Sequence, residues 1–189
     1  MMLSERTSEA LDILVGQYFQ LNRTFDRCVS WMEVKFAMPN AANIIHHKLA
    51  HLWPLMADTV SDFKHQWNMT TYYPETRGDK RTYDNLEQMM DTMLRETLDI
   101  YQVIKQTYYI AKEEKDFNAN VMLQELMQDM NKVVAQIILL DDKAKQMPTE
   151  YDKYDRHIGS WGIVGLEDYQ RLSLESPRIQ KIILLLIAP

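Results

Sequence analysis

The chain has 189 residues, of which 46% are hydrophobic and 25% charged, the usual balance of a globular protein with a sizeable core. Its net charge of −6 argues against nucleic-acid binding, because proteins that bind phosphate backbones present a basic face. The single cysteine, Cys28, excludes an internal disulfide framework and fits a reducing compartment. No secretory leader pattern and no bilayer-spanning apolar run is visible, so we predict a cytoplasmic protein without membrane contact.

Apolar residues recur at alternating spacings of three and four along four long stretches, a pattern typical of helices packed in a bundle. These stretches run from about Thr7 to Phe36, Ala41 to Trp67, Thr82 to Lys112 and Asn118 to Gln146. Pro54 lies inside the second stretch and removes one backbone hydrogen bond, so we expect a kink there. The predicted fold class is therefore all-α.

Connection lengths predict the topology. Short links join the first helix to the second and the third to the fourth, which makes each pair an antiparallel hairpin. The second and third helices are joined by residues 68–81, which reach at most about 50 Å when extended. A second helix of about 26 residues is roughly 39 Å long at ~1.5 Å per residue, so this link can run the length of the bundle. We predict an antiparallel four-helix bundle of the ferritin-like kind, with a long crossover between helices two and three.

The pattern changes after the fourth helix, so we divide the chain into a bundle at residues 1–147 and an extension at 148–189. Tyr151, Tyr154, Trp161 and Tyr169 are suited to pack this extension onto the bundle. Its end, Ile179 to Ile187, is strongly apolar. We expect the extension to dock on its own bundle or on a neighbouring subunit.

Several stretches between Val29 and Lys143 resemble the Dps branch of the ferritin superfamily, the starvation-induced mini-ferritins. They are Ser30-Trp31-Met32, His47-Lys48-Leu49 with Asp62 fifteen residues later, Asn85-Leu86 through Lys112, and Asp129-Met130-Asn131-Lys132. The resemblance implies a cage-like oligomer that stores iron and oxidises it as a ferroxidase, with ligands shared between subunits.

The chain also departs from the pattern of that family. Ser30 stands where the family has a histidine ligand in helix one, and Gln66 stands where it has the last carboxylate of helix two. The crossover is shorter than is usual in the family. The core stripes carry no Asp, Glu or His, so we expect no di-iron site inside the bundle. Cys28 lies on a core stripe and is interpreted as a small buried hydrophobe.

Histidine and aspartate gather instead on the outward face of the second helix. At roughly 100° per residue, His47, His51, Asp58, Asp62 and His65 fall within about 60° of one another, opposite the apolar stripe. Imidazole and carboxylate together suit iron and other divalent ions.

The order of these residues is symmetric about Pro54 and Leu55. Two copies of this helix crossing antiparallel about a two-fold axis would set His47 against Asp62 of the partner and His51 against Asp58. Three interpretations stay open: a solvated polar face, His–Asp contacts between subunits without metal, and an inter-subunit metal site.

Two functions follow. The first is a Dps-like homo-oligomer that binds iron or another divalent metal at His47, His51, Asp58 and Asp62 across a two-fold contact of helix two. The second is a ferritin-like bundle without a metal site that serves as an oligomeric interaction module.

Overall fold

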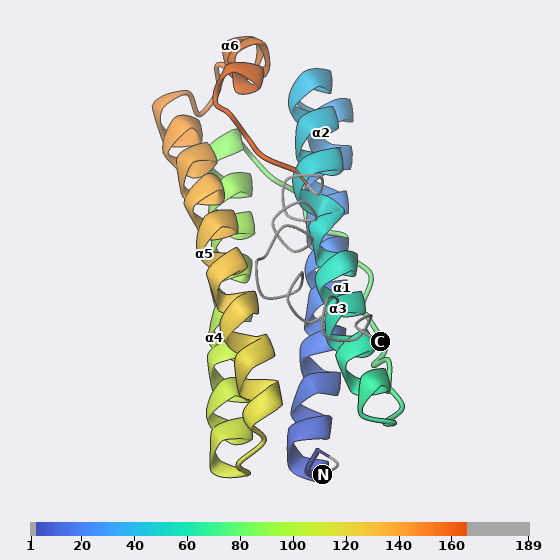
Figure 1. Cartoon of the computed structure of the whole chain (residues 1–189). Helices are drawn as coiled ribbons and strands as arrows, with labels where there is room; N and C mark the ends of the chain where they lie inside the picture. The colour runs from blue at the N-terminus through green and yellow to red at the C-terminus, as the bar shows by residue number, and fades with distance from the viewer. Residues whose placement is uncertain (1–2, 166–189) are drawn as a thin grey trace, which may run out of the picture.

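The first long helix begins at a serine cap. The structure, a computed structural model, describes residues 3–165, and over that range it is all-helical, as predicted (Figure 1). Helix α1 spans Glu5–Val34, and the hydroxyl of Ser4 accepts a hydrogen bond from the Thr7 amide at 3.0 Å. The stripe of α1 that includes Leu11, Leu14 and Phe25 is fully buried. The apolar period of the sequence thus becomes the inner face of the helix.

The chain then turns and runs back along α1. Helix α2 (Pro39–Ile45), the π-helical turn η1 (His46–Ala50) and helix α3 (Leu52–Gln66) follow one another along a single path, antiparallel to α1 (Figure 1). Trp53 packs edge-on against Phe25 of α1, with ring centroids 5.1 Å apart. The chain therefore follows the course predicted for the second helix, but a π-helical turn interrupts the α-helix just before Pro54.

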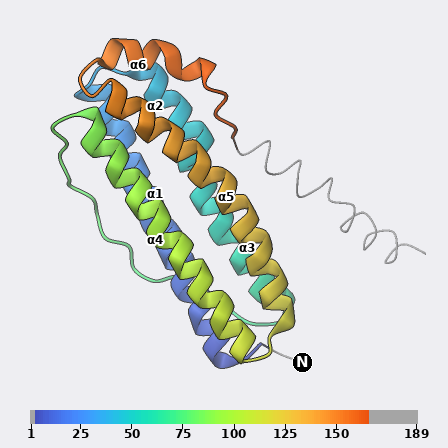
Figure 2. The same ribbon diagram turned by 90° about the vertical axis from the view of Figure 1, so that its left-hand side faces the viewer.

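Helices α4 (Leu86–Glu113) and α5 (Phe117–Gln146) form the second hairpin. Asn85 caps α4 by accepting a hydrogen bond from the Gln88 amide at 2.9 Å, and Lys115 takes a positive φ of 63° in the turn to α5. Helix α4 lies between α1 and α5 and packs on both (Figure 2). The long axes of α1, α3, α4 and α5 lie side by side.

The segment between α3 and α4 runs along α1 in the same direction as that helix. Successive hydrogen bonds fix this path: the Tyr72 amide to Asp12 at 3.0 Å, the Arg77 amide to Gln20 at 2.8 Å, and Trp31 to the Tyr83 carbonyl at 3.2 Å. Pro74 lies so close to Gly16 that a Cβ there would be 2.7 Å from its ring, so only glycine fits. The connection thus returns the chain to the other end of the molecule before α4 begins (Figure 2).

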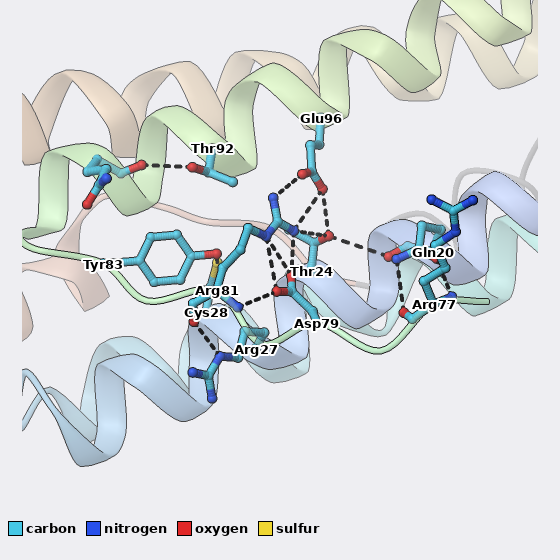
Figure 3. Close-up of polar contacts among 11 residues, drawn as sticks. Gln20, Thr24, Arg27, Cys28, Arg77, Asp79, Arg81, Tyr83, Thr92 and Glu96 are labelled. Atoms are coloured by element: carbon cyan, nitrogen blue, oxygen red, sulfur yellow. Dashed lines mark hydrogen bonds and ion pairs between the residues drawn. The ribbon is translucent and has the colours of Figure 1, made fainter.

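The side chain of Arg81 links this connection to α1 and α4 (Figure 3). Its guanidinium pairs with Asp79 of the connection and with Glu96 of α4, and it donates to the hydroxyl of Thr24 of α1 at 2.8 Å. These contacts hold the pKa of Arg81 above its usual value. The side chain of Arg27 also reaches the Arg81 carbonyl, at 2.7 Å.

Residues 148–165 pack against the same end of the molecule as α2. Helix α6 (Tyr151–His157) and the 3₁₀ turn η2 (Ile158–Ser160) lie there. Tyr151 stacks on Phe36 with centroids 4.5 Å apart, and the buried Tyr154 hydroxyl donates to the Leu140 carbonyl at 3.1 Å. The remaining part of the predicted extension, including Tyr169 and Ile179 to Ile187, lies outside the described residues.

Candidate metal centre

The path from α2 to α3 leaves α-helical geometry at η1. The His51 amide donates to the carbonyl of His46, five residues earlier, at 3.3 Å. Pro54 has no N–H with which to bond the carbonyl of Ala50, four residues before it. The side-chain amide of Asn22 on α1 bonds that carbonyl instead, at 3.1 Å. The missing N–H of Pro54 and the hydrogen bond from Asn22 are both compatible with a π-helical turn here. Such irregularities often mark functional sites.

Three histidines meet on this turn. One nitrogen from each of His46, His47 and His51 lies within 4.8 Å of the nitrogens of the other two. The ring centroids are 4.5 to 5.4 Å apart. Within residues 3–165 this is the only group of three or more potential His, Cys, Asp or Glu ligands close enough to share one ion. We call these residues the histidine triad.

The π-helical turn explains why His46 belongs to the triad. In an α-helix, residues five apart point in different directions, whereas a π-helical turn closes at the fifth residue. His46 and His51 are five apart, and their centroids are the closest pair, at 4.5 Å. A helical projection at 100° per residue therefore selected His47 and His51 and missed His46. Two features of the sequence could have pointed to His46 as a ligand: it lies next to His47, and it lies eight residues before Pro54.

The four predicted ligands divide into two pairs. His47 and His51 lie in the triad, and both are exposed. Asp58 and Asp62 are also exposed, but they lie farther along α3 and outside the triad. Asp62 lies 3.9 Å from Nδ1 of His65 on its own helix. Residues 3–165 of one chain thus supply three imidazoles and no carboxylate to the cluster.

The surroundings of His51 favour its neutral imidazole, the form that binds metal. Partial desolvation lowers the pKa of His51, and the neighbouring rings of His46 and His47 lower it further. Asp26 of α1 opposes this effect, and its Oδ1 lies 3.6 Å from Nδ1 of His46.

A groove of about 470 Å³ opens beside the triad, between α1 and α2. Its lining is polar along α1, with Asp26, Ser30 and Glu33 on three successive turns of that helix. Ser30, which stands where the resemblance places a histidine, therefore lies across the groove from His46 and His47. The full lining is Asp26, Val29, Ser30, Glu33, Pro39, Ala42, Asn43, His46 and His47.

The C-terminal segment holds the helix that leads into the triad. Helix α2 has no capping side chain at its own N-terminus. Asp155 of α6 supplies one, accepting hydrogen bonds from the Ala41 amide at 2.7 Å and from the side chain of Asn40 at 3.0 Å. Lys48 of η1 donates to the Ile163 carbonyl at 2.5 Å. The triad is therefore supported from α1 on one side and from residues 151–163 on the other.

The dimensions of the triad match metal coordination after a small adjustment. Nitrogens bound at about 2.1 Å to one ion of tetrahedral geometry lie about 3.4 Å apart. The triad nitrogens span up to 4.8 Å, so the rings need to move by less than about 1 Å. Three imidazoles suit Zn²⁺, Fe²⁺, Cu²⁺ or Ni²⁺, and a three-ligand site leaves coordination positions for water or a second donor.

Two other buried polar side chains, Cys28 and Lys64, have hydrogen-bond or ion-pair partners within the core. The thiol of Cys28 is fully buried, as interpreted from the sequence, and lies 3.4 Å from the Tyr83 hydroxyl. The ammonium group of Lys64 is also fully buried, where it pairs with Asp12 and donates to the Ser8 carbonyl at 3.2 Å. Both groups already have partners of the right kind, which favours a structural role.

No protein-family model and no curated protein sequence matches the chain. Across residues 3–165, no helix combines the length and the apolar character needed to cross a membrane.

Proposed function

We propose that this protein binds a divalent transition-metal ion at His46, His47 and His51. The observation that carries the proposal is the approach of three imidazole nitrogens to within 4.8 Å on one π-helical turn. Two features support it. The pKa of His51 is lowered, which favours the neutral form of that ring, and the side chain of Asn22 on α1 bonds the carbonyl of Ala50 at the end of the turn.

Iron is the physiological ion that we propose, within a ferritin-like four-helix bundle related to the Dps branch. The long crossover along α1 and the histidines on the outward face support this assignment. Iron oxidation would need carboxylate ligands as well, and the part of the chain that the structure describes brings none to the triad. The ferroxidase reaction is therefore proposed only for an assembled oligomer in which a partner supplies Asp58 and Asp62.

That oligomer would form through the outward face of η1 and α3. His47, His51, Asp58 and Asp62 are exposed along this face, in an order that an antiparallel two-fold contact would match. In such a contact, each triad would meet the carboxylates of the other chain. Without metal, the same face would serve as an interaction surface.

Titration calorimetry of untagged protein tests the metal site. Zn²⁺ and, under anaerobic conditions, Fe²⁺ should bind at one site per chain. His46→Ala and His51→Ala should each abolish that site, because two imidazoles alone hold an exposed ion weakly. His65→Ala and His157→Ala are matched controls outside the triad and should bind as the wild type does. Unchanged binding in both triad variants would refute the proposal.

Sedimentation analysis tests the assembly. The paired replacement Asp58→Asn with Asp62→Asn should shift the protein toward the monomer while its helix content stays constant. Glu87→Gln with Asp91→Asn removes the same charge from an exposed turn of α4 and should leave association unchanged. An oligomer that depends on Asp58 and Asp62 but takes up no metal would favour the interaction module. A wild-type monomer at all concentrations would exclude both assemblies.

A further inference from the structure

His46 differs from the other two histidines because one of its ring nitrogens is inaccessible. Its Nδ1 atom is buried, and within residues 3–165 no group forms a hydrogen bond with it. The charged atom facing it is Oδ1 of Asp26, 3.6 Å away across the contact between α1 and η1. A buried polar nitrogen without a partner is unfavourable, and a carboxylate at this distance is close to satisfying it.

We infer that Asp26 is a positioning residue that fixes the tautomer of His46 and directs its Nε2 toward the metal. This inference rests on the proposed function of the triad. With the proton on Nδ1 facing the Asp26 carboxylate, Nε2 carries the free lone pair that can bind a metal ion. Metal-bound histidines commonly donate their second N–H to a carboxylate in this manner.

The distance fits this role. A charge-assisted hydrogen bond between nitrogen and carboxylate is about 2.8 Å long. The observed 3.6 Å closes to that length when the ring moves by about 0.8 Å, a shift of the same size as the one that brings the three nitrogens onto one ion. Each contact is therefore within reach of a small movement of the His46 side chain.

The placement of Asp26 on α1 supports the inference independently. Asn22 and Asp26 are four residues apart, so they lie on one face of α1. Asn22 reaches the carbonyl of Ala50, the last residue of η1, and Asp26 faces His46, the first. Two successive turns of α1 thus support the two ends of the π-helical turn that builds the triad.

Glu33 offers a matched control for the charge of Asp26. It lines the same groove and carries the same charge, but it makes no ion pair with the triad. Loss of a general electrostatic attraction for cations would affect Glu33→Gln and Asp26→Asn alike. Loss of a specific partner for His46 affects Asp26→Asn alone.

The test combines metal affinity with the tautomer of His46 in the metal-free protein. Competition titration with Zn²⁺ should show affinity about tenfold to a hundredfold lower in Asp26→Asn, the usual effect of losing such a partner. Glu33→Gln should bind within about threefold of the wild type, and Asp26→Glu should recover part of the loss. Proton–nitrogen correlation spectra should show His46 with its proton on Nδ1 in the wild type and a mixture of tautomers in Asp26→Asn.

The two proposals fail in different ways. A wild-type protein that binds no Zn²⁺ refutes the proposed function, and the tautomer spectrum still decides the role of Asp26. Equal affinities in Asp26→Asn and Glu33→Gln, or a wild-type His46 protonated on Nε2, would overturn the inference. If Asp26→Asn does not fold, the tautomer of His46 in the wild type and the Zn²⁺ affinity of Asp26→Glu decide whether Asp26 positions His46.

Discussion

The side-chain amide of Asn22 donates a hydrogen bond to the carbonyl oxygen of Ala50, 3.1 Å away, where Pro54 can donate none. This contact ties α1 to the π-helical turn that carries the histidine triad. A tertiary contact thus takes the place of a helical hydrogen bond, and it shapes the site.

Replacing Asn22 with alanine should damage both the fold and the site. The carbonyl of Ala50 would lose its partner in a buried setting, at an expected loss of about 1–2 kcal/mol in the free energy of unfolding. Metal affinity should fall as well, because His51 follows Ala50 directly. Urea denaturation and Zn²⁺ titration measure the two effects. Asn118→Ala, at an exposed position of α5, is the control, and equal behaviour of the two variants would count against this role.

The cap that Asp155 provides for α2 is a second point to test. Asp155→Ala should lower the free energy of unfolding by about 1 kcal/mol, the usual value for a lost N-cap. Amide hydrogen exchange at Ala41 should accelerate, because its N–H would lose the Asp155 carboxylate. Asp152→Ala removes an exposed aspartate of the same helix and should have little effect. Protection at Ala41 that survives in Asp155→Ala would contradict the cap.

The buried pair of Lys64 and Asp12 should be costly to break. Lys64→Ala leaves the Asp12 carboxylate, which is 16% exposed, without its cation, so stability should fall by about 3 kcal/mol. Replacing both residues, Lys64→Met with Asp12→Leu, should recover part of that loss, because no buried charge is left unpaired although the Tyr72 amide still loses its acceptor. Lys112→Ala on the exposed side of α4 is the control for removing a lysine. A change below about 0.5 kcal/mol in Lys64→Ala would rule out a structural pair.

The thiol of Cys28 should be unreactive until the protein opens. Burial raises its pKa to about 12, and the hydrogen bond with Tyr83 only partly offsets that effect. At pH 8 the thiolate is therefore scarce and inaccessible, and a disulfide reagent should modify Cys28 at the rate of unfolding. The reaction rate should rise with urea in step with loss of helix signal. Rapid modification in the absence of denaturant would contradict the buried position.

The helices were predictable from the sequence because their apolar stripes are long and regular. The ends of α1, α4 and α5 lie within a few residues of those predicted, and the all-helical class is confirmed. The second helix was harder to predict. Pro54 predicted an irregularity, but its form depends on Asn22, which lies 28 residues away from Ala50 along the chain.

The site was predictable only in part for the same reason. Periodicity identified His47 and His51 as outward-facing residues, and both are exposed. His46 joins them only because the π-helical turn changes the angular spacing. Buried charges were also missed. Lys64 and Asp141 are nearly inaccessible, and each is made possible by an ion pair that periodicity does not reveal.

The metal centre can be located by diffraction from crystals of the untagged protein soaked in Zn²⁺, with data recorded on both sides of the zinc absorption edge. We expect an anomalous peak about 2.0–2.1 Å from one nitrogen each of His46, His47 and His51. Any carboxylate ligand completing the site should come from Asp58 or Asp62 of a neighbouring chain. A peak elsewhere in the chain, or no peak in a protein whose triad is free of lattice contacts, would contradict the metal centre.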